Sequence, residues 1–287
     1  MAPTQLRCGD LSVSLASPLV MAIVNVTPDS FSDGGSYHSA QGQLQLTAVL
    51  NRVEAMLQEG ADIIDVGGES TRPGAIPVSL EDELARVIPV IEAIRKRFDV
   101  VVSVDTSRPE VISQAADAGA GIINDVRALE LPGALAAAAN TSLPVCLMHM
   151  RGSPQTMQAN TEYDDCLNEV HAYLAGRQRA ALDASIAGDN ILLDPGFGFG
   201  KTEQHNLALI NQLYRFHDLE CPLLVGVSRK STIGTILNKP VEERLVGSLV
   251  LAYESLRQGA KILRVHDVGP TVDMVKMYNA LDQNRGS

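Results

Sequence analysis

The chain has 287 residues, of which 45% are hydrophobic and 20% charged, a balance typical of a folded globular protein rather than a disordered one. Its formal net charge of −11 repels a phosphate backbone, so no nucleic-acid partner is expected. An anionic small molecule is not excluded, because a few cations placed in a pocket outweigh the global charge.

The N-terminus and the cysteines bear on the cellular compartment. The first 18 residues lack the apolar core of a secretory signal, and no apolar stretch reaches the roughly 18 residues of a membrane span. Cys8, Cys146, Cys166 and Cys221 follow neither C-x-x-C nor zinc spacing, so we expect reduced, structural thiols. These features predict a cytoplasmic protein that does not associate with membranes.

The predicted elements begin with a small β-hairpin over residues 4–18, where polarity alternates around a Cys-Gly-Asp turn. Apolar runs of strand length then recur, each bounded by Gly, Pro, Asn or Asp. These runs are too short for helices and too continuously apolar for half-exposed strands, so they are predicted to be buried parallel strands. They cover residues 19–26, 61–67, 100–105, 120–126, 143–149, 190–196, 221–228 and 260–266.

Helical patterns separate these runs. From residue 79 to 98 apolar side chains follow the helical period, with Ser79 as N-cap and with Pro89 expected to kink the helix or leave a carbonyl unpaired. Other helical patterns cover residues 43–59, 107–118, 132–139, 164–187, 202–216, 241–258 and 271–283. The alternation predicts an α/β protein, a (β/α)8 TIM barrel with an N-terminal β-hairpin closing its floor and with residues 1–287 as one domain. An open doubly wound sheet is the alternative.

Polar residues end nearly every predicted strand. In a barrel the active site forms at the carboxyl ends of the strands, so these side chains are expected to face one mouth. Asp105 and Asp194 are carboxylates on apolar strands and need a cation or an N–H donor as partner, which suits a ligand rich in N–H groups. For Asp125 and His149 a turn or capping role is the simpler interpretation. The strand-end residues are Asn25, Asp65, Asp105, Asn124, Asp125, His149, Asp194, Ser228, Arg229, Lys230, Ser231, Arg264 and His266.

The stretch DPGFGFGKT, residues 194–202, ends like a phosphate-binding loop but misses its spacing. The pattern G-x-x-x-x-G-K-[ST] needs a glycine where Pro195 stands, and a dinucleotide fingerprint needs a glycine where Lys201 stands. The glycines are instead expected to let the backbone approach a flat ligand, with Phe197 and Phe199 as apolar walls.

Two late motifs carry cations. SRKSTIG places Arg229 and Lys230 just beyond a strand, and Ser231 and Thr232 are expected to cap the helix that follows, which makes an anion site. RVHD, residues 264–267, adds an arginine and an imidazole at the last strand end, where barrel enzymes often hold phosphate.

Two early connections, residues 25–43 and 67–79, are rich in Gly, Ser and Pro and exceed the usual loop length. Their position fits active-site lids, which exclude water during group transfer. They carry Phe31, Asp33, Thr71 and Arg72.

Seven motifs, in their order and spacing, resemble the dihydropteroate synthase family of the bacterial folate pathway. The resemblance covers about residues 19–268, and no motif position departs from the family's pattern. The motifs are NVTPDSFSDGG, DVGGESTRPGA, SVDTS, INDV, DPGFGFGK, VGVSRKS and RVHDV.

The resemblance implies a transferase that condenses 6-hydroxymethyl-7,8-dihydropterin pyrophosphate with para-aminobenzoate, giving 7,8-dihydropteroate and pyrophosphate with the help of Mg²⁺. By the same resemblance pyrophosphate leaves first and the amine attacks a pterin-methylene cation, so the main task of catalysis is to stabilise the departing charge. The resemblance further implies inhibition by sulfonamides, which mimic para-aminobenzoate, and a homodimer formed through the late helices.

The resemblance also implies a role for each motif residue. The residues implied for pterin binding are Asp105, Asn124, Asp194, Lys230 and Arg264. Those implied for pyrophosphate binding are Asn25, Arg72, Arg264 and His266, with Mg²⁺ at Asn25. Those implied for para-aminobenzoate binding are Phe31, Thr71, Arg72, Pro73, Phe199, Lys230 and Ser231. The residues expected to act in catalysis are Asn25, Asp33, Asp105, Lys230, Arg264 and His266.

Three other functions fit parts of the pattern. A pterin-binding methyltransferase that uses methyltetrahydrofolate on the same barrel shares the carboxylates and the asparagine, but has no use for the cations of SRKS and RVHD. A phosphate-loop nucleotide hydrolase is disfavoured by the missing glycine. An inactive pterin-binding protein is disfavoured by the complete set of strand-end groups.

Overall fold

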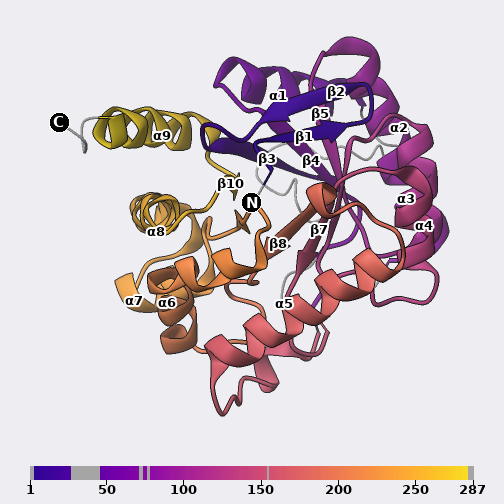
Figure 1. Ribbon diagram of the computed structural model, residues 1–287. Coiled ribbons are helices and arrows are strands. Elements are labelled where there is room, and N and C mark those ends of the chain that lie inside the picture. Colours follow the sequence, from indigo (N-terminus) through magenta and orange to yellow (C-terminus); the bar gives the residue numbers. More distant parts are fainter. Residues whose placement is uncertain (1–2, 27–45, 71–73, 76–77, 154, 284–287) are drawn as a thin grey trace.

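The structure is a barrel of parallel strands surrounded by helices (Figure 1). The computed structural model describes residues 3–26, 46–70, 74–75, 78–153 and 155–283. Within these residues the barrel strands are β3 (Leu19–Asn25), β4 (Ile63–Gly67), β5 (Val101–Asp105), β6 (Ile122–Asp125), β7 (Val145–Met148), β8 (Ile191–Asp194), β9 (Leu224–Val225) and β10 (Ile262–Val265). They pair in parallel in the order β8-β7-β6-β5-β4-β3-β10-β9. A parallel bridge between Leu193 and Leu223 joins the two edges, so the sheet closes on itself as predicted.

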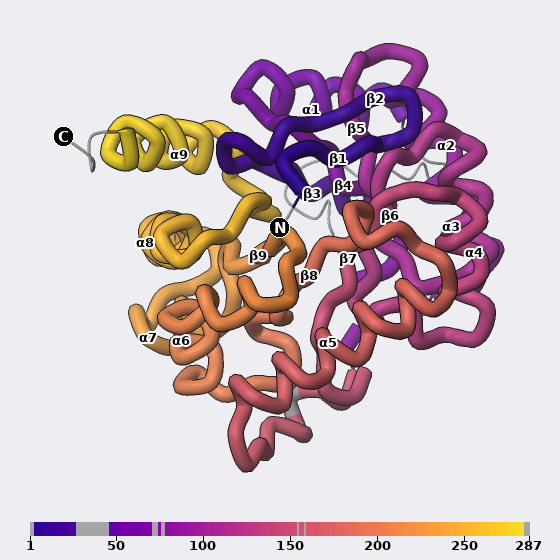
Figure 2. The backbone as a smooth tube through the Cα atoms, in the orientation of Figure 1, coloured from indigo at the N-terminus to yellow at the C-terminus, as the bar shows by residue number. Residues whose placement is uncertain are grey.

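The helices follow one another round the outside of the strands in chain order (Figure 2). They are α1 (Leu46–Gln58), α2 (Leu80–Arg97), α3 (Pro109–Asp117), α4 (Ala134–Thr141), α5 (Cys166–Asp183), α6 (Glu203–Asn211), α7 (Ser231–Leu237), α8 (Leu245–Arg257) and α9 (Val268–Gln283). The larger core lies between the two layers, where Val24 of β3 and Val53 of α1 are both fully buried. Removal of this apolar surface from water is the main source of stability.

The N-terminal hairpin covers one mouth of the barrel. Its strands β1 (Gln5–Cys8) and β2 (Leu11–Ser14) pair antiparallel. Leu6 and Cys8 pack with Met21, Ile63 and Ile122, which fill the barrel interior at the start of the strands. Closure of the barrel floor by a hairpin, expected from the sequence, is therefore confirmed.

The strand register aligns residues at the opposite mouth of the barrel, where the strands end. Asn25 pairs with Gly67, Gly67 with Asp105, and Asp105 with Asn124, so four neighbouring strands place these residues in one row. Residues paired in this way point to the same face of a sheet. Because Gly67 has no side chain, it leaves room between Asn25 and Asp105, whose Oδ1 and Oδ2 would each lie 3.7 Å from a Cβ at that position.

Some element boundaries differ from the predictions. The amide of Asp82 donates to Ser79 Oγ at 3.0 Å, which confirms the N-cap of α2, and α2 continues as one helix through Pro89. The helix expected over residues 202–216 ends at Asn211, and a 3₁₀ segment follows over Leu213–Leu219.

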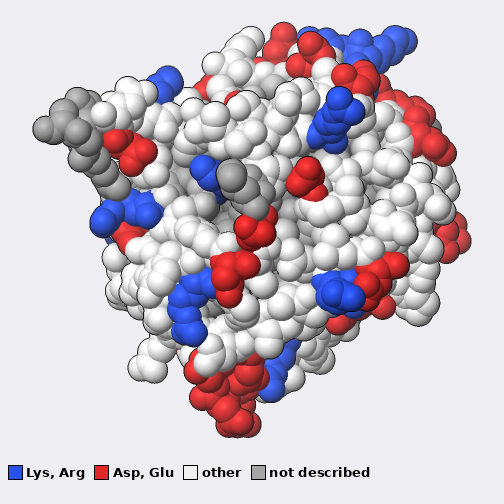
Figure 3. Space-filling view, in the orientation of Figure 1, with Lys and Arg blue, Asp and Glu red and all other residues white. Residues whose placement is uncertain are grey.

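Three further observations concern the molecule as a whole. All four cysteines are buried and unpaired, as expected for structural thiols. Of the helices that the structure describes, none combines the length and the apolar character needed to cross a bilayer. On the face in Figure 3, Lys and Arg side chains are scattered among Asp and Glu rather than gathered in one patch.

Candidate active site

A pocket opens at the carboxyl ends of the strands, the mouth opposite the hairpin. Its apolar walls include Ile23, Val126, Met148 and Phe197. Of the residues predicted for the site, the pocket brings together Asn124, Asp194, Phe199, Lys230, Arg264 and His266. The sequence therefore identified most of the described polar lining.

Arg264 of β10 lies between two carboxylates. Its Nε donates to Asp65 Oδ2 and its Nη2 to Asp105 Oδ2, both at 2.7 Å. Asp65 is completely buried and Asp105 nearly so. Although burial disfavours its charge, these two carboxylates raise the pKa of Arg264 further above its ordinary value. The cation expected beside Asp105 is thus confirmed, and Arg264 keeps N–H groups beyond those two for a ligand.

Burial raises the pKa of Asp105 to about 7, and the neighbouring Arg264 opposes this shift. Asn124 completes this corner of the pocket, with its Nδ2 3.4 Å from Asp65 Oδ2. The side-chain oxygen of Asn124 and the second oxygen of Asp105 are hydrogen-bond acceptors that suit a ligand edge with adjacent N–H groups.

Asp194 and Lys230 form the other side of the pocket. The amide of Gly196 donates to Asp194 Oδ1 at 2.7 Å, which supplies the N–H partner expected for this carboxylate. Burial raises the pKa of Asp194, and the Gly196 amide and Lys230 oppose that shift. Burial lowers the pKa of Lys230 to about 7, against the attraction of Asp194. Lys230 Nζ lies 3.8 Å from the centre of the Phe199 ring, a cation–π contact.

His266 stands at the rim of the pocket as a neutral imidazole. Burial, followed by the charge of Arg264, lowers its pKa to about 3. Ser228 Oγ accepts from the His266 backbone amide at 3.2 Å and lies 3.1 Å from its Nδ1. With the serine hydroxyl donating to Nδ1, the ring carries its proton on Nε2 and has one N–H to offer a ligand.

The start of α7 differs from the prediction. The N-cap position is Lys230, without a side-chain cap, so the expectation that Ser231 and Thr232 cap the helix is wrong. Thr232 Oγ1 instead accepts from Asn206 Nδ2 at 3.0 Å. Arg229 forms a two-bond ion pair with Asp267, with distances of 2.9 and 2.6 Å. Lys230 is therefore the cation of this motif that enters the pocket.

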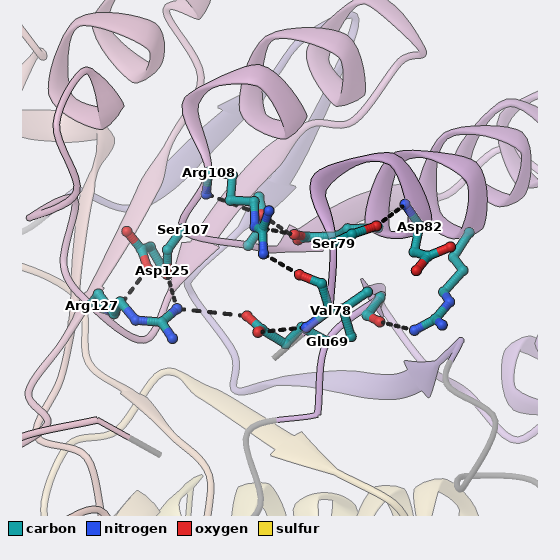
Figure 4. Close-up of polar contacts among 12 residues, drawn as sticks. Glu69, Val78, Ser79, Asp82, Ser107, Arg108, Asp125 and Arg127 are labelled. Atoms are coloured by element: carbon teal, nitrogen blue, oxygen red, sulfur yellow. Dashed lines mark hydrogen bonds and ion pairs between the residues drawn. The ribbon is translucent and has the colours of Figure 1, made fainter. Parts of the chain in front are cut away.

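Asp125 belongs to a network outside the pocket, in agreement with its expected turn role (Figure 4). It accepts from the amides of Arg127 and Leu129 at 2.8 and 2.7 Å, and Ser107 Oγ donates to it. Burial raises the pKa of Asp125, and the Ser107 bond opposes this shift. Arg127 in turn lies 3.8 Å from Glu69, at the start of the connection after β4.

Most residues of the predicted para-aminobenzoate site come from the two early connections. Phe31, Asp33, Thr71, Arg72 and Pro73, from the two early connections, lie outside the described residues. Ser231 is exposed at the first turn of α7.

The described residues offer few side-chain ligands for a metal ion. In the part of the chain that the structure describes, no group of three or more His, Cys, Asp or Glu side chains could hold an ion. Asn25 is half-buried at the end of β3, beside Gly67 and Asp105. A single neutral oxygen ligand fits Mg²⁺, which keeps several waters and binds largely through substrate phosphates.

Two residues that support the pocket have roles that the sequence does not indicate. Asp65 is predictable only as a strand-end group, because its partner Arg264 lies 199 positions away. Lys201 is recognisable in the sequence only as the residue that breaks a nucleotide motif. Its Nζ lies 2.8 Å from His149 Nδ1 and is buried beneath the pocket wall.

Comparisons with known proteins agree with this geometry. A model of the pterin binding enzyme family matches residues 21–266. The dihydropteroate synthase of Escherichia coli K12 is 55% identical over 269 residues, which cover 94% of this chain and 93% of that protein. The Haemophilus influenzae dihydropteroate synthase is 50% identical over 274 residues and covers 96% of each chain.

Solved structures are similar over almost the whole chain as well. The Yersinia pestis dihydropteroate synthase in a sulfonamide drug complex superposes with a TM-score of 0.92 at 49% identity, covering 97% of this chain and 99% of that one. The Xanthomonas albilineans enzyme in complex with 7,8-dihydropteroate superposes with a TM-score of 0.87 at 43% identity, covering 97% and 98%. The chain belongs to the dihydropteroate synthase family of pterin-binding enzymes.

Proposed function

We propose that this protein condenses 6-hydroxymethyl-7,8-dihydropterin pyrophosphate with para-aminobenzoate to give 7,8-dihydropteroate and pyrophosphate. The observation that carries the proposal is one pocket that holds Asn124, Asp194 and Lys230 together with Arg264 and His266. The first three suit the edge of a pterin, and the last two suit a departing anion. Dihydropteroate synthases from Xanthomonas albilineans have been solved with 4-aminobenzoic acid and with 7,8-dihydropteroate, which supports the same ligands here.

The pterin ring would bind through its N–H groups. Asp194 and Asp105 would accept from the pyrimidine edge, Asn124 would complete that edge, and Lys230 would donate to the ring carbonyl. Burial raises the pKa of both carboxyls and lowers the pKa of the lysine. In the free protein, neighbouring charges and hydrogen bonds therefore do not fully offset the cost of burying these three charged groups. A bound pterin would supply the missing partners, which favours binding of this ligand over an apolar one.

Pyrophosphate departure is the demanding step. The C–O bond between the pterin methylene and the diphosphate breaks with its electron pair on oxygen. Arg264, the N–H of neutral His266 and the amide of Asn25 would then stabilise the leaving group. Mg²⁺, with Asn25 as the protein ligand, would neutralise phosphate charge when bound. The aromatic amine of para-aminobenzoate then forms the C–N bond and loses a proton, so no strong protein base is required.

The para-aminobenzoate pocket would lie towards Phe199. We place the ring against Phe199 and the carboxylate near Ser231, at the first turn of α7. Phe31 and Asp33 from the first early connection, and Thr71, Arg72 and Pro73 from the second, would complete the site by resemblance to the family.

The reaction is tested by mixing the two substrates with the purified protein. We expect release of one pyrophosphate for each 7,8-dihydropteroate formed, with a requirement for Mg²⁺. Binding of a pterin without pyrophosphate release would instead favour the methyltransferase alternative. A sulfonamide should compete with para-aminobenzoate and raise its KM without changing kcat.

We further propose that the active form is a cytoplasmic homodimer built through the late helices. Val246 and Val250 stand one turn apart on α8 and are 69% and 61% exposed, and Met277 on α9 is 62% exposed. The helices α8 and α9 are neighbours, and exposed apolar side chains on adjacent elements often mark an interface. Val250→Asp should shift the protein from dimer to monomer in analytical ultracentrifugation. A wild-type protein that sediments as a monomer would contradict the proposal.

A further inference from the structure

The lysine of the glycine-rich stretch turns away from the pocket. Only 3% of Lys201 is exposed, and it is not part of the pocket wall. Its Nζ lies 2.8 Å from His149 Nδ1, 2.9 Å from the Gly196 carbonyl and 3.0 Å from the Phe199 carbonyl. Burial lowers the pKa of Lys201 to about 7. Its protonated form has three N–H groups and no acceptor, so these three partners satisfy it completely.

His149 is a suitable acceptor only while it is neutral. Burial, followed by the charge of Lys201, lowers the pKa of His149 to about 2. Its backbone amide donates to the Asp194 carbonyl at 2.9 Å, and its ring packs edge-on against Tyr173 of α5 with the ring centres 4.9 Å apart. The acceptor is thus fixed to the end of β8 and to a helix of the outer layer.

The loop that Lys201 binds has a backbone conformation that favours glycine at three positions. Gly196, Gly198 and Gly200 have φ of +70°, +83° and +64°, in the left-handed region. A Cβ on Gly196 would collide with the carbonyl oxygen of His149. The alternating left-handed residues turn loop carbonyls inward, and buried carbonyls need donors.

The outer side of the same loop builds the pocket. Phe199 gives its carbonyl to Lys201 and its ring to the pocket, 3.8 Å from Lys230 Nζ. Asp194 begins the loop on β8 and is fixed by the strand as well as by Gly196. Phe199 lies on the loop rather than on a strand, and Lys201 binds its carbonyl from the side away from the pocket.

We propose that Lys201, with His149 as its acceptor, is a positioning residue that holds Phe199 in place for para-aminobenzoate. The inference rests on the proposed function and deepens it. Lys201 touches no substrate. It ties the loop carbonyls to the barrel, so its loss should disturb the Phe199 side of the pocket more than the pterin side, whose acceptors Asp105, Asn124 and Asp194 lie on strands.

The test compares Lys201→Met, which has no donor, with Lys201→Gln, which keeps two, and with Lys96→Met at an exposed site on α2. Misplacement of a positioning group costs up to about 100-fold, so we expect the KM for para-aminobenzoate to rise about 10-fold or more in Lys201→Met. Lys201→Gln should be intermediate and Lys96→Met unchanged. The Kd of a pterin, measured by calorimetry, should change by less than about 3-fold in all three.

A folded Lys201→Met protein with the wild-type KM for para-aminobenzoate would overturn the inference. An equal loss for both ligands would do the same, since it would indicate general destabilisation. Wild-type turnover is measured first: if the wild type forms no dihydropteroate, the proposed function itself is wrong, and that result is distinct from a failure of Lys201 alone.

A second measurement needs no variant. In wild-type protein labelled with ¹⁵N-histidine, His149 should show a protonated Nε2 and an unprotonated Nδ1 from about pH 6 to about pH 8. This is the tautomer that accepts from Lys201. A proton on Nδ1, or an imidazolium in this range, would overturn the inference even if Lys201→Met fails to fold.

Discussion

Asp105, which is bound to Arg264, and Lys230 of the pocket have pKa values shifted towards the same pH from opposite sides. Burial raises the pKa of Asp105 to about 7 and lowers the pKa of Lys230 to about 7. Below this pH the carboxyl is protonated and loses its role as a charged acceptor. Above it the amine is neutral and loses its role as a cation. Since kcat/KM reports the free enzyme, we expect a bell-shaped pH profile with its maximum near pH 7.

Lys230→Arg tests whether the alkaline limb comes from Lys230 or from Lys201, since burial lowers the pKa of both lysines to about 7. Lys230→Arg keeps a cation whose pKa stays far above this range, so the fall in kcat/KM above about pH 7 should disappear while the acid limb remains. Steady-state rates at saturating Mg²⁺ over the pH range would measure both limbs. An unchanged alkaline limb in Lys230→Arg would show that another group causes it.

Asp65 stabilises Arg264 from below the pocket. Asp65→Asn would leave the guanidinium with one carboxylate, and loss of a buried partner costs about 3 kcal/mol. We expect that loss in urea denaturation, and kcat/KM reduced about 10-fold or more because Arg264 shifts. Ser103, which pairs with Asp65 in the register and whose buried Oγ has no partner among the described residues, gives the control. Ser103→Ala should leave both quantities unchanged.

At the residue scale, only part of the site could be predicted from the sequence. Asp105, Asn124 and Asp194 were predicted because each ends an apolar run, a local signal. The Asp65–Arg264 pair and the Lys201–His149 bond join residues 199 and 52 positions apart. Nothing in the sequence next to either residue indicates its partner. Such pairs follow from barrel closure and from the turned glycine loop, which need the three-dimensional arrangement.

At the scale of elements, two arginines fix the two ends of the connection between β4 and α2; Arg108 and Val78 at the second end are labelled in Figure 4. Arg86 donates to the Gly68 carbonyl at 3.1 Å, and Arg108 donates to the Val78 carbonyl. Arg108 also pairs with Glu83 of α2 at 2.9 Å, a carboxylate that is 1% exposed. The connection that carries three predicted para-aminobenzoate residues is therefore anchored at its two described ends.

Replacement of Arg108 should lower the free energy of unfolding, because the buried Glu83 carboxylate would lose its cation. Burial raises the pKa of Glu83, and the Thr106 bond and Arg108 oppose the shift. In Arg108→Met the carboxylate loses its cation, and we expect a loss of about 3 kcal/mol in urea denaturation. The double variant Arg108→Met with Glu83→Gln should recover part of this loss, because no charge is then buried. Additive effects in the double-mutant cycle would contradict coupling between the two side chains.

Element boundaries were predictable where a local rule decides them. Ser79 satisfies an amide of α2, so the helix start could be read from the sequence. The end of α6 could not, because residues 212–216 continue an apolar pattern that tertiary packing accommodates as a 3₁₀ segment instead. The apolar run at 221–228 keeps only Leu224–Val225 as strand, since its neighbours bend to close the barrel and to form the pocket wall.

At the scale of the molecule, stability and chemistry lie at opposite mouths of the barrel. The hairpin fills the mouth at the strand starts, and the pocket occupies the mouth at the strand ends. In barrels of this kind residues at the first mouth serve stability and those at the second serve catalysis. A substitution in the hairpin core should therefore change one property without the other.

Leu6→Ala tests this separation. Leu6 is fully buried among Met21, Ile63 and Ile122, and its truncation leaves a cavity in a closed interior. Leu→Ala changes of this type cost about 3 to 5 kcal/mol, so the urea midpoint should fall. Both KM values, measured well below the new unfolding transition, should match the wild type, because the row from Asn25 to Asn124 is held by strand pairing. A changed KM for either substrate would mean that hairpin packing also sets the strand ends, and that the two mouths are coupled through the barrel.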